Sequence, residues 1–168
     1  MNAAVLTIST SVANGGAEDR SGPALAQLMR QAGADVRAHE VVADDRGAIE
    51  DALRRFCSPE ASIDLVFTTG GTGLTPDDVT PEATAAVIDR DAPGFAEAMR
   101  ARSLQHTPLG ILTRGISGIA GRTLIINFPG NPKAIDELFP VVAPTLEHAV
   151  ATLRRDDAGA KERHGPGG

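Results

Sequence analysis

The chain has 168 residues, about the length of one domain and enough to bury a substantial core. Its formal net charge of −6 argues against nucleic acid as the main partner, because phosphate backbones attract basic surfaces. No apolar run is long enough to span a membrane, the first residues lack the pattern of a signal peptide, and a single cysteine excludes an intramolecular disulfide. We therefore expect a cytoplasmic protein.

Short apolar runs alternate with segments of helical periodicity in the first half of the chain. Buried strands are predicted at residues 5–9 and 65–69, and weak alternation predicts a further strand at 35–42. Apolar residues at the i, i+3, i+4, i+7 spacing predict helices at 21–33 and 49–56. Ser21 is suited to cap the first of these helices, and Gly33 to end it.

The second half continues the alternation. Helices are predicted from Pro81 onward and over 94–103, and strands at 111–112 and 124–128. Helical periodicity then resumes to about residue 153, with Pro140 and Pro144 expected to break or kink it. The remaining segment is polar and glycine-rich. We therefore predict one domain at residues 1–153 and a disordered tail at 154–168.

This order of elements predicts an α/β fold with three layers, in which a mainly parallel sheet has helices on both faces. Ligands in such folds bind beyond the carboxyl ends of the strands. The glycine clusters and most of the conspicuous polar residues of this chain directly follow predicted strands. A functional site is therefore expected at that edge of the sheet.

The strongest chemical signal is the loop after the strand at 65–69. Residues that could bind a ligand there, through close backbone N–H groups or hydroxyls, are Thr69, Gly70, Gly71, Thr72 and Gly73. Asp77 and Asp78 follow, and Thr80-Pro81 has the sequence of a helix start. The loop is neither a P-loop nor a dinucleotide fingerprint, because their lysine and glycine spacings are missing. Taken alone, it is more typical of a strand-to-helix turn with solvated carboxylates.

A second loop follows the strand at 124–128. Gly130 permits a sharp turn, Asn131 can cap a helix, and Pro132 suits the first helical position. Lys133 then places a cation in the first turn, where the helix dipole disfavours it unless an anion is bound. The sequence indicates either a phosphate or carboxylate site or an ordinary surface lysine.

Isolated polar residues follow other strands. Asp44 and Asp45 come after the strand at 35–42, where acids are usually caps or solvated. A metal site is favoured if Asp44 and Asp78 converge, because Mg²⁺ is commonly held by one or two carboxylates and substrate phosphates. The four histidines show no ligand spacing, so neither a zinc site nor a Ser-His-Asp triad is expected. We interpret Cys57 as a buried, inert thiol.

Three motifs occur in a fixed order along the chain. They are Asp19-Arg20-Ser21-Gly22, then Thr69-Gly70-Gly71-Thr72-Gly73 with Asp78-Val79-Thr80-Pro81-Glu82, and finally Pro129-Gly130-Asn131-Pro132-Lys133. Together they resemble the MoaB/Mog-like family of molybdopterin-binding proteins, over roughly residues 4–153.

The resemblance implies a nucleotidyltransferase of molybdenum cofactor biosynthesis, which adenylylates molybdopterin with Mg-ATP and releases pyrophosphate. It also implies a homotrimer or homohexamer, with the molybdate-inserting enzyme of the pathway as a further partner. Neither nucleic acid nor a membrane is an expected partner. The alternative is a non-catalytic molybdopterin-binding or assembly protein on the same fold.

The resemblance also assigns roles to residues. Asp44 and Asp78 match the family's acids, and we expect them to be catalytic and to hold Mg²⁺. Residues expected to bind substrate or nucleotide are Thr69, Gly70, Gly71, Thr72, Gly73, Ser117, Gly130, Asn131 and Lys133. Two positions depart from the family pattern: Asp77 stands where arginine is frequent, and Thr10 stands where an acid often follows the first strand. Both departures bear on how ATP is handled.

Overall fold

The computed structural model describes the backbone of residues 1–162 and the side chains of residues 1–155. Its centre is a six-stranded sheet of order β2-β1-β3-β6-β5-β4. Four strands are parallel: β1 (Asn2–Ile8), β2 (Asp35–Val42), β3 (Leu65–Thr69) and β6 (Thr123–Phe128). The short strands β5 (Ser117–Ala120) and β4 (Arg90–Asp91) complete one side, with β5 antiparallel to β6 and β4 antiparallel to β5. The predicted α/β class and mainly parallel sheet are confirmed.

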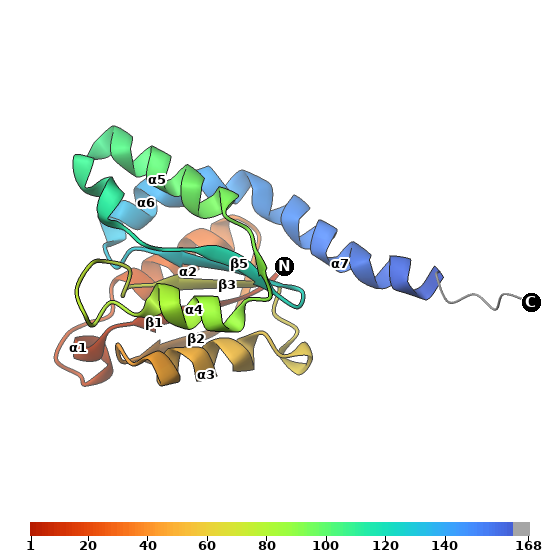
Figure 1. The fold of residues 1–168 in the computed structure, drawn as a ribbon, viewed down its shortest axis with the longest axis horizontal. Helices are drawn as coiled ribbons and strands as arrows, with labels where there is room; N and C mark the ends of the chain where they lie inside the picture. Colours follow the sequence, from red (N-terminus) through yellow and green to blue (C-terminus); the bar gives the residue numbers. More distant parts are fainter. Residues whose placement is uncertain (163–168) are drawn as a thin grey trace, which may run out of the picture.

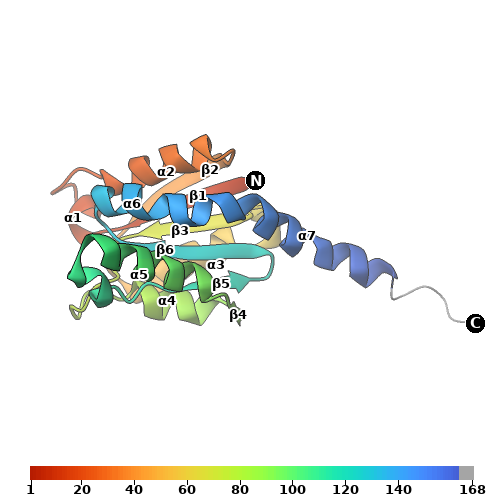
Figure 2. The same cartoon turned by 90° about the horizontal axis from the view of Figure 1, so that it is seen from above.

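Helices cover both faces of the sheet, as Figures 1 and 2 show. One face packs against α2 (Ser21–Gln31), α5 (Gly94–His106), α6 (Pro132–Val142) and α7 (Leu146–Glu162). The other face packs against α3 (Arg46–Phe56) and α4 (Thr80–Val87). The shorter elements are α1 (Thr10–Ala13) and the 3₁₀ turns η1 (Pro59–Ala61), η2 (Pro108–Leu112) and η3 (Ala143–Thr145).

The core is divided by the alternation of side chains along the central strands. In β1, Ala3 and Val5 face α2 and α6, whereas Leu6 and Ile8 face α3. Three phenylalanines on β3, β6 and α6 form a cluster with ring centroids 5.2, 6.2 and 6.3 Å apart: Phe67, Phe128 and Phe139. This cluster supports the end of β6, from which a polar loop leaves the sheet.

The helix starts were only partly predicted. Asn131 caps α6 as expected, since its side chain accepts a hydrogen bond from the Lys133 N–H. Ser21 does not cap α2; it is the first helical residue, and the carboxylate of Asp19 accepts from the Gly22 N–H instead. Thr80 likewise lies inside α4, and its hydroxyl donates to the Gly70 carbonyl. Both side chains that were expected to serve a local cap lie inside their helices.

The predicted strand at 111–112 was wrong, because these residues belong to the 3₁₀ turn η2. Two adjacent apolar residues carry too little pattern to distinguish a strand from a turn, and Ile111 is 68% exposed. The short strands β4 and β5 were not predicted. They are only two and four residues long and lie at one side of the sheet. Strands this short are recognised by their hydrogen-bonded pairing and not by their amino-acid composition.

The chain remains helical after residue 153, where a disordered tail was expected. α7 continues to Glu162, and residues 163–168 of the expected tail lie outside the described residues. Arg154 extends the ordered structure because its guanidinium donates to both oxygens of Asp64, at 3.1 and 2.7 Å. None of the described helices is both long and apolar enough to cross a membrane.

Candidate functional site

Three loops meet at the carboxyl ends of β1, β3 and β6, around Gly70. Gly70 has φ +101°, and a Cβ there would lie 2.2 Å from the carbonyl oxygen of Ile8. A Cβ on Gly130 would lie 3.3 Å from the Cα of Gly70, and the Thr69 hydroxyl donates to the Pro129 carbonyl at 2.8 Å. Only glycine at position 70 permits this approach. The two predicted loops therefore form one continuous surface.

Asp44 reaches this surface from the end of β2. Its Oδ2 accepts hydrogen bonds from the backbone N–H of Thr10 at 2.9 Å and from the Thr10 hydroxyl at 3.0 Å. Its Oδ1 lies 3.3 Å from the position of a Cβ on Gly71. The half-buried carboxylate thus lies beside the glycine loop, whereas its neighbour Asp45 caps α3 by accepting from the Ala48 N–H.

Asp78 lies at the other end of the same loop. Its Oδ2 accepts from the Thr75 N–H at 3.0 Å and from the Thr75 hydroxyl at 2.9 Å, and lies 2.7 Å from the position of a Cβ on Gly73. Asp44 and Asp78 therefore border the same glycine loop, one beside Gly71 and the other beside Gly73. Two carboxylates fit Mg²⁺ when substrate phosphates complete the shell, and no group of three His, Cys, Asp or Glu in the described chain could hold a metal alone.

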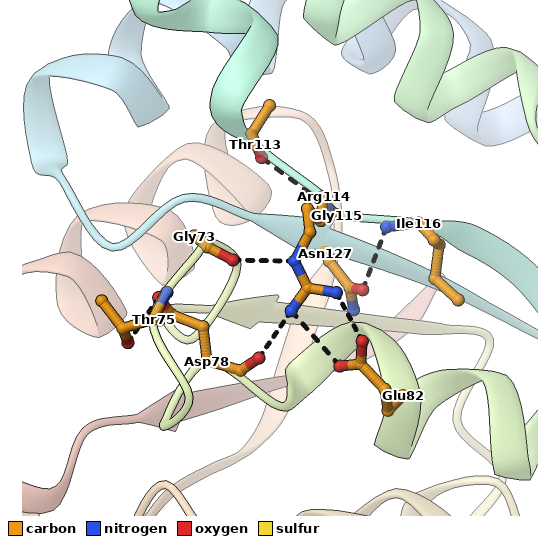
Figure 3. A network of polar contacts seen from close by, with 9 residues as sticks. All are labelled: Gly73, Thr75, Asp78, Glu82, Thr113, Arg114, Gly115, Ile116 and Asn127. Carbon is orange, nitrogen blue, oxygen red and sulfur yellow. Dashed lines mark hydrogen bonds and ion pairs between the residues drawn. The ribbon is translucent and has the colours of Figure 1, made fainter.

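Arg114, for which the sequence predicted no specific role within its polar, glycine-rich turn, holds the glycine loop in place (Figure 3). Its Nε donates to the Gly73 carbonyl at 2.8 Å, its Nη2 donates to the Asp78 carbonyl at 2.6 Å, and its guanidinium pairs with the Glu82 carboxylate. Its own N–H donates to the Thr72 carbonyl at 2.8 Å. The available signal was an arginine in a glycine-containing turn before a strand, but the partners of its side chain lie 32 to 41 residues away.

The ion pair between Arg114 and Glu82 affects the protonation of both groups. The hydrogen bond that Arg114 donates to Glu82 holds the pKa of Glu82 below its ordinary value and raises the pKa of Arg114. Because Glu82 lies in the first turn of α4, its negative charge also suits the positive end of that helix. The loop is therefore tied to the start of α4 through charged groups.

Asn127 forms a buried polar junction beneath the same loop. Its Nδ2 donates to the hydroxyls of Thr68 and Thr84, both at 3.0 Å, and its Oδ1 accepts from the Ile116 N–H at 3.1 Å. These contacts join β3, β6, α4 and the turn that carries Arg114. An asparagine in an otherwise apolar strand was a signal that this position has a specific partner, because buried polar groups need hydrogen bonds.

Lys133 and Ser117 differ in how far they are available to a ligand. Lys133 is exposed in the first turn of α6, and it has no ion pair within the described part of the chain. Ser117 is buried; its hydroxyl donates to the Ala92 carbonyl at 2.6 Å and accepts from the Ala96 N–H at 3.1 Å. In this arrangement Ser117 holds the start of α5 and offers no hydroxyl to a ligand.

A cavity of about 330 Å³ opens at this edge on the side of α2 and α6. Its lining includes Ser9, Ser11, Arg20, Ser21, Gly70 and Gly130. The Asp19-Arg20-Ser21-Gly22 motif shapes it, since Asp19 accepts from the Thr7 hydroxyl at 2.8 Å and lies 3.1 Å from Nε2 of His39. The first motif therefore lies at the same edge as the other two.

Known proteins resemble this chain in sequence and in fold. Residues 4–148 match the family described as "Probable molybdopterin binding domain". Molybdopterin adenylyltransferase from Helicobacter pylori is 42% identical over 148 residues, covering 87% of this chain and 84% of that protein. Molybdenum cofactor synthesis protein cinnamon from Drosophila melanogaster is 37% identical over 95% of this chain, but the chain spans only 27% of its length. The crystal structure of the molybdopterin biosynthesis enzyme MoaB from Thermus thermophilus has TM-score 0.84 at 40% identity, covering 90% of this chain and 95% of that one.

Proposed function

The chain belongs to the molybdopterin-binding domain family, and on that premise we propose that it adenylylates molybdopterin in molybdenum cofactor biosynthesis. An oxygen of the molybdopterin phosphate forms a bond to the α-phosphorus of ATP, while the bond from that phosphorus to the β-phosphate oxygen breaks and pyrophosphate leaves. The support is a relative named molybdopterin adenylyltransferase at 42% identity over most of both chains. The observation that carries the proposal is that Asp44 and Asp78 flank one glycine loop.

The loops supply what nucleotidyl transfer needs, which is mainly position and charge neutralisation. We assign Asp44 and Asp78 to Mg²⁺, which when bound neutralises phosphate charge. The backbone N–H groups of Gly70–Gly73 approach phosphate oxygens without side-chain bulk. Arg114 holds the loop in position by donating hydrogen bonds to two of its carbonyls.

We assign the cavity between α2 and α6 to molybdopterin. Its serine hydroxyls and Arg20 can hydrogen-bond to pterin and phosphate groups, and the start of α6 adds Lys133 and backbone donors. Gly70 and Gly130 line the cavity and also belong to the surface that the two glycine-containing loops form, so the two substrates would meet there. Thr69 and Thr72 support this surface, since Thr69 bonds to Pro129 and Thr72 to Arg114.

The family resemblance further supports a cytoplasmic homotrimer or homohexamer that hands its product to the molybdate-inserting enzyme. Exposed apolar side chains on α5 and η2 are compatible with burial in an oligomer: Leu104, Leu109, Ile111 and Leu112. Light scattering of the purified protein measures the oligomer directly. A monomer at micromolar concentration would contradict this part of the proposal.

A non-catalytic molybdopterin-binding protein is the second candidate, favoured by Asp77. This exposed carboxylate adds negative charge beside Asp78, where an incoming nucleotide is also negative. Under this alternative the protein would bind molybdopterin but release no pyrophosphate from ATP. The two candidates therefore differ in one measurable product.

The test is incubation of the purified protein with molybdopterin, ATP and Mg²⁺, with pyrophosphate as the readout. We expect Asp44→Asn and Asp78→Asn each to lower turnover by a factor on the order of 100 or more, because each removes a charge that holds the metal. Asp51→Asn, at an exposed position of α3, is the matched control and should keep full turnover. Molybdopterin binding without pyrophosphate release would establish the non-catalytic alternative.

A further inference from the structure

Thr10 and Thr75 hold the two carboxylates of the site in the same way. Thr10 donates both its backbone N–H and its hydroxyl to Oδ2 of Asp44, at 2.9 and 3.0 Å. Thr75 donates the same two groups to Oδ2 of Asp78, at 3.0 and 2.9 Å. One threonine follows β1 and the other belongs to the β3–α4 loop, so the repeated arrangement does not come from one local turn.

Each aspartate also donates a hydrogen bond back to its threonine, and the resulting ring of hydrogen bonds fixes the plane of the carboxylate. The Asp44 N–H donates back to the Thr10 hydroxyl at 3.0 Å, and the Asp78 N–H donates back to the Thr75 carbonyl at 3.0 Å. A carboxylate that accepts two hydrogen bonds on one oxygen, within such a ring, loses most of its freedom to rotate. Thr10 thereby also joins the end of β1 to the end of β2.

The other oxygen of each carboxylate is left for a ligand. Oδ1 of Asp44 and Oδ1 of Asp78 accept no hydrogen bond from any described residue, although both carboxylates are half-buried. Oδ1 of Asp44 lies 3.3 Å from the position of a Cβ on Gly71, whereas Oδ1 of Asp78 lies 3.9 Å from that of a Cβ on Gly73, farther than the threonine-bound Oδ2 at 2.7 Å. Both carboxylates still border the loop assigned to the phosphates. An acceptor held in place by its partner oxygen needs no reorganisation when a cation binds.

We propose that Thr10 and Thr75 are positioning residues, each presenting one carboxylate oxygen to the metal–nucleotide complex. This inference rests on the proposed function and names the residues that prepare its site. The competing explanation is that the threonines only stabilise their loops. The two explanations differ because loop stabilisation changes the unfolding midpoint, whereas positioning changes metal–nucleotide affinity in a protein that is equally folded.

The experiment compares valine and serine at both positions. Thr10→Val and Thr75→Val keep the shape and the backbone N–H but lose the hydroxyl, which at position 10 also accepts from the Asp44 N–H. Thr10→Ser and Thr75→Ser keep the hydroxyl. Thr152→Val, whose hydroxyl bonds to the His148 carbonyl on α7, is the matched control. Binding of Mn²⁺ together with ATP is measured by electron paramagnetic resonance without molybdopterin, alongside turnover and thermal unfolding.

We expect each valine variant to bind Mn²⁺·ATP and to turn over about tenfold less well, since a hydrogen bond to a charged group is lost. The serine variants and the control should stay close to the unsubstituted protein, with unchanged unfolding midpoints. Valine variants with normal affinity, or serine variants as impaired as valine, would overturn the inference. If the unsubstituted protein binds Mn²⁺·ATP but forms no pyrophosphate, adenylyl transfer is contradicted. The role of the threonines is then still decided by comparing the Mn²⁺·ATP affinities of the variants. An unsubstituted protein that binds no Mn²⁺·ATP would overturn both.

Discussion

Lys133 is the residue whose role depends most on a bound anion. It stands exposed in the first turn of α6, where the helix dipole disfavours a cation, and no described residue forms an ion pair with it. A phosphate at this helix start would remove the unfavourable interaction and accept a charge-assisted hydrogen bond. We therefore propose that the side chain serves substrate binding.

We predict that Lys133→Ala raises the KM of a phosphate-bearing substrate by about tenfold and leaves kcat nearly unchanged, because the contact exists before and during the reaction. Steady-state kinetics with each substrate varied in turn measures this. Arg30→Ala, at the other end of the domain in the last turn of α2, is the control for loss of one positive charge. Equal KM values for Lys133→Ala and the unsubstituted protein would make Lys133 an ordinary surface lysine.

The pair of Arg114 and Glu82 predicts how the loop responds to acid. The pKa of Glu82 is lowered in the folded protein, chiefly by its hydrogen bond to Arg114. A lowered carboxyl pKa stabilises the fold above the unfolded value of about 4.3, and this contribution is lost as the pH falls through the folded pKa. We therefore expect Glu82→Gln to reduce the loss of unfolding free energy between about pH 6 and pH 3.

The measurement is urea unfolding at a series of pH values. Because the Glu82 side chain is 43% exposed, the difference should be small, below about 1 kcal/mol, and weaker in high salt. Glu97→Gln, in the first turn of α5, provides the control for loss of an acid near a helix start. Parallel pH profiles for Glu82→Gln and the unsubstituted protein would show that the pair adds no acid-sensitive stability.

At the scale of elements, the sequence predicted strands and helix caps that depend on local signals, and it missed contacts between elements distant in the chain. The strands at 35–42 and 65–69 were predicted because apolar periodicity and flanking glycines are local signals. The cap by Asn131 was predicted for the same reason. The roles of Arg114 and Asn127 were missed because their partners lie on other elements, and Ser117 was assigned to a pocket although its hydroxyl holds α5.

Glycine is required at position 70 for two reasons: its positive φ and its close approach to the Ile8 carbonyl. A pair of substitutions can separate these two contributions. Gly33 and Gly70 both have positive φ, at +87° and +101°, but a Cβ on Gly33 meets nothing within 4 Å. Gly33→Ala should therefore cost about 1 kcal/mol for backbone conformation alone. Gly70→Ala should cost about 2 kcal/mol more, because its Cβ collides with the Ile8 carbonyl.

Denaturant unfolding of both variants gives the two free energies. Gly70→Ala should also weaken ATP binding, since relief of the collision moves the loop that borders Asp44 and Asp78. Gly33→Ala should leave binding unchanged, because Gly33 follows α2 at the opposite edge. Equal unfolding free energies for the two variants would show that β1 and the glycine loop can separate without cost.

At the scale of the whole molecule, the two edges of the sheet serve different purposes. A second cavity of similar size, about 360 Å³, lies at the amino edge, beside Cys57 and Arg154, and not where the three motifs meet. Burial raises the pKa of the Cys57 thiol to about 11, which keeps it protonated and inert near neutral pH. Cavity size alone therefore does not locate the function; we propose the site at the opposite edge, where the glycine loop and the two carboxylates lie.

This division predicts that stability at the amino edge can be changed without changing catalysis. Asp64 is only 13% exposed, and it accepts two hydrogen bonds from Arg154 and one from the N–H of Asn2 at 2.7 Å. Arg154→Met keeps the apolar stem and removes the fork of donors, so it should lower the unfolding free energy by about 1 kcal/mol. Turnover and KM should be unchanged, because the site lies at the other ends of the same strands. Asp64→Asn completes a double-mutant cycle that isolates the pair, and its coupling energy should fall as salt is added. A fall in turnover with Arg154→Met at full stability would mean instead that α7 communicates with the site across the sheet.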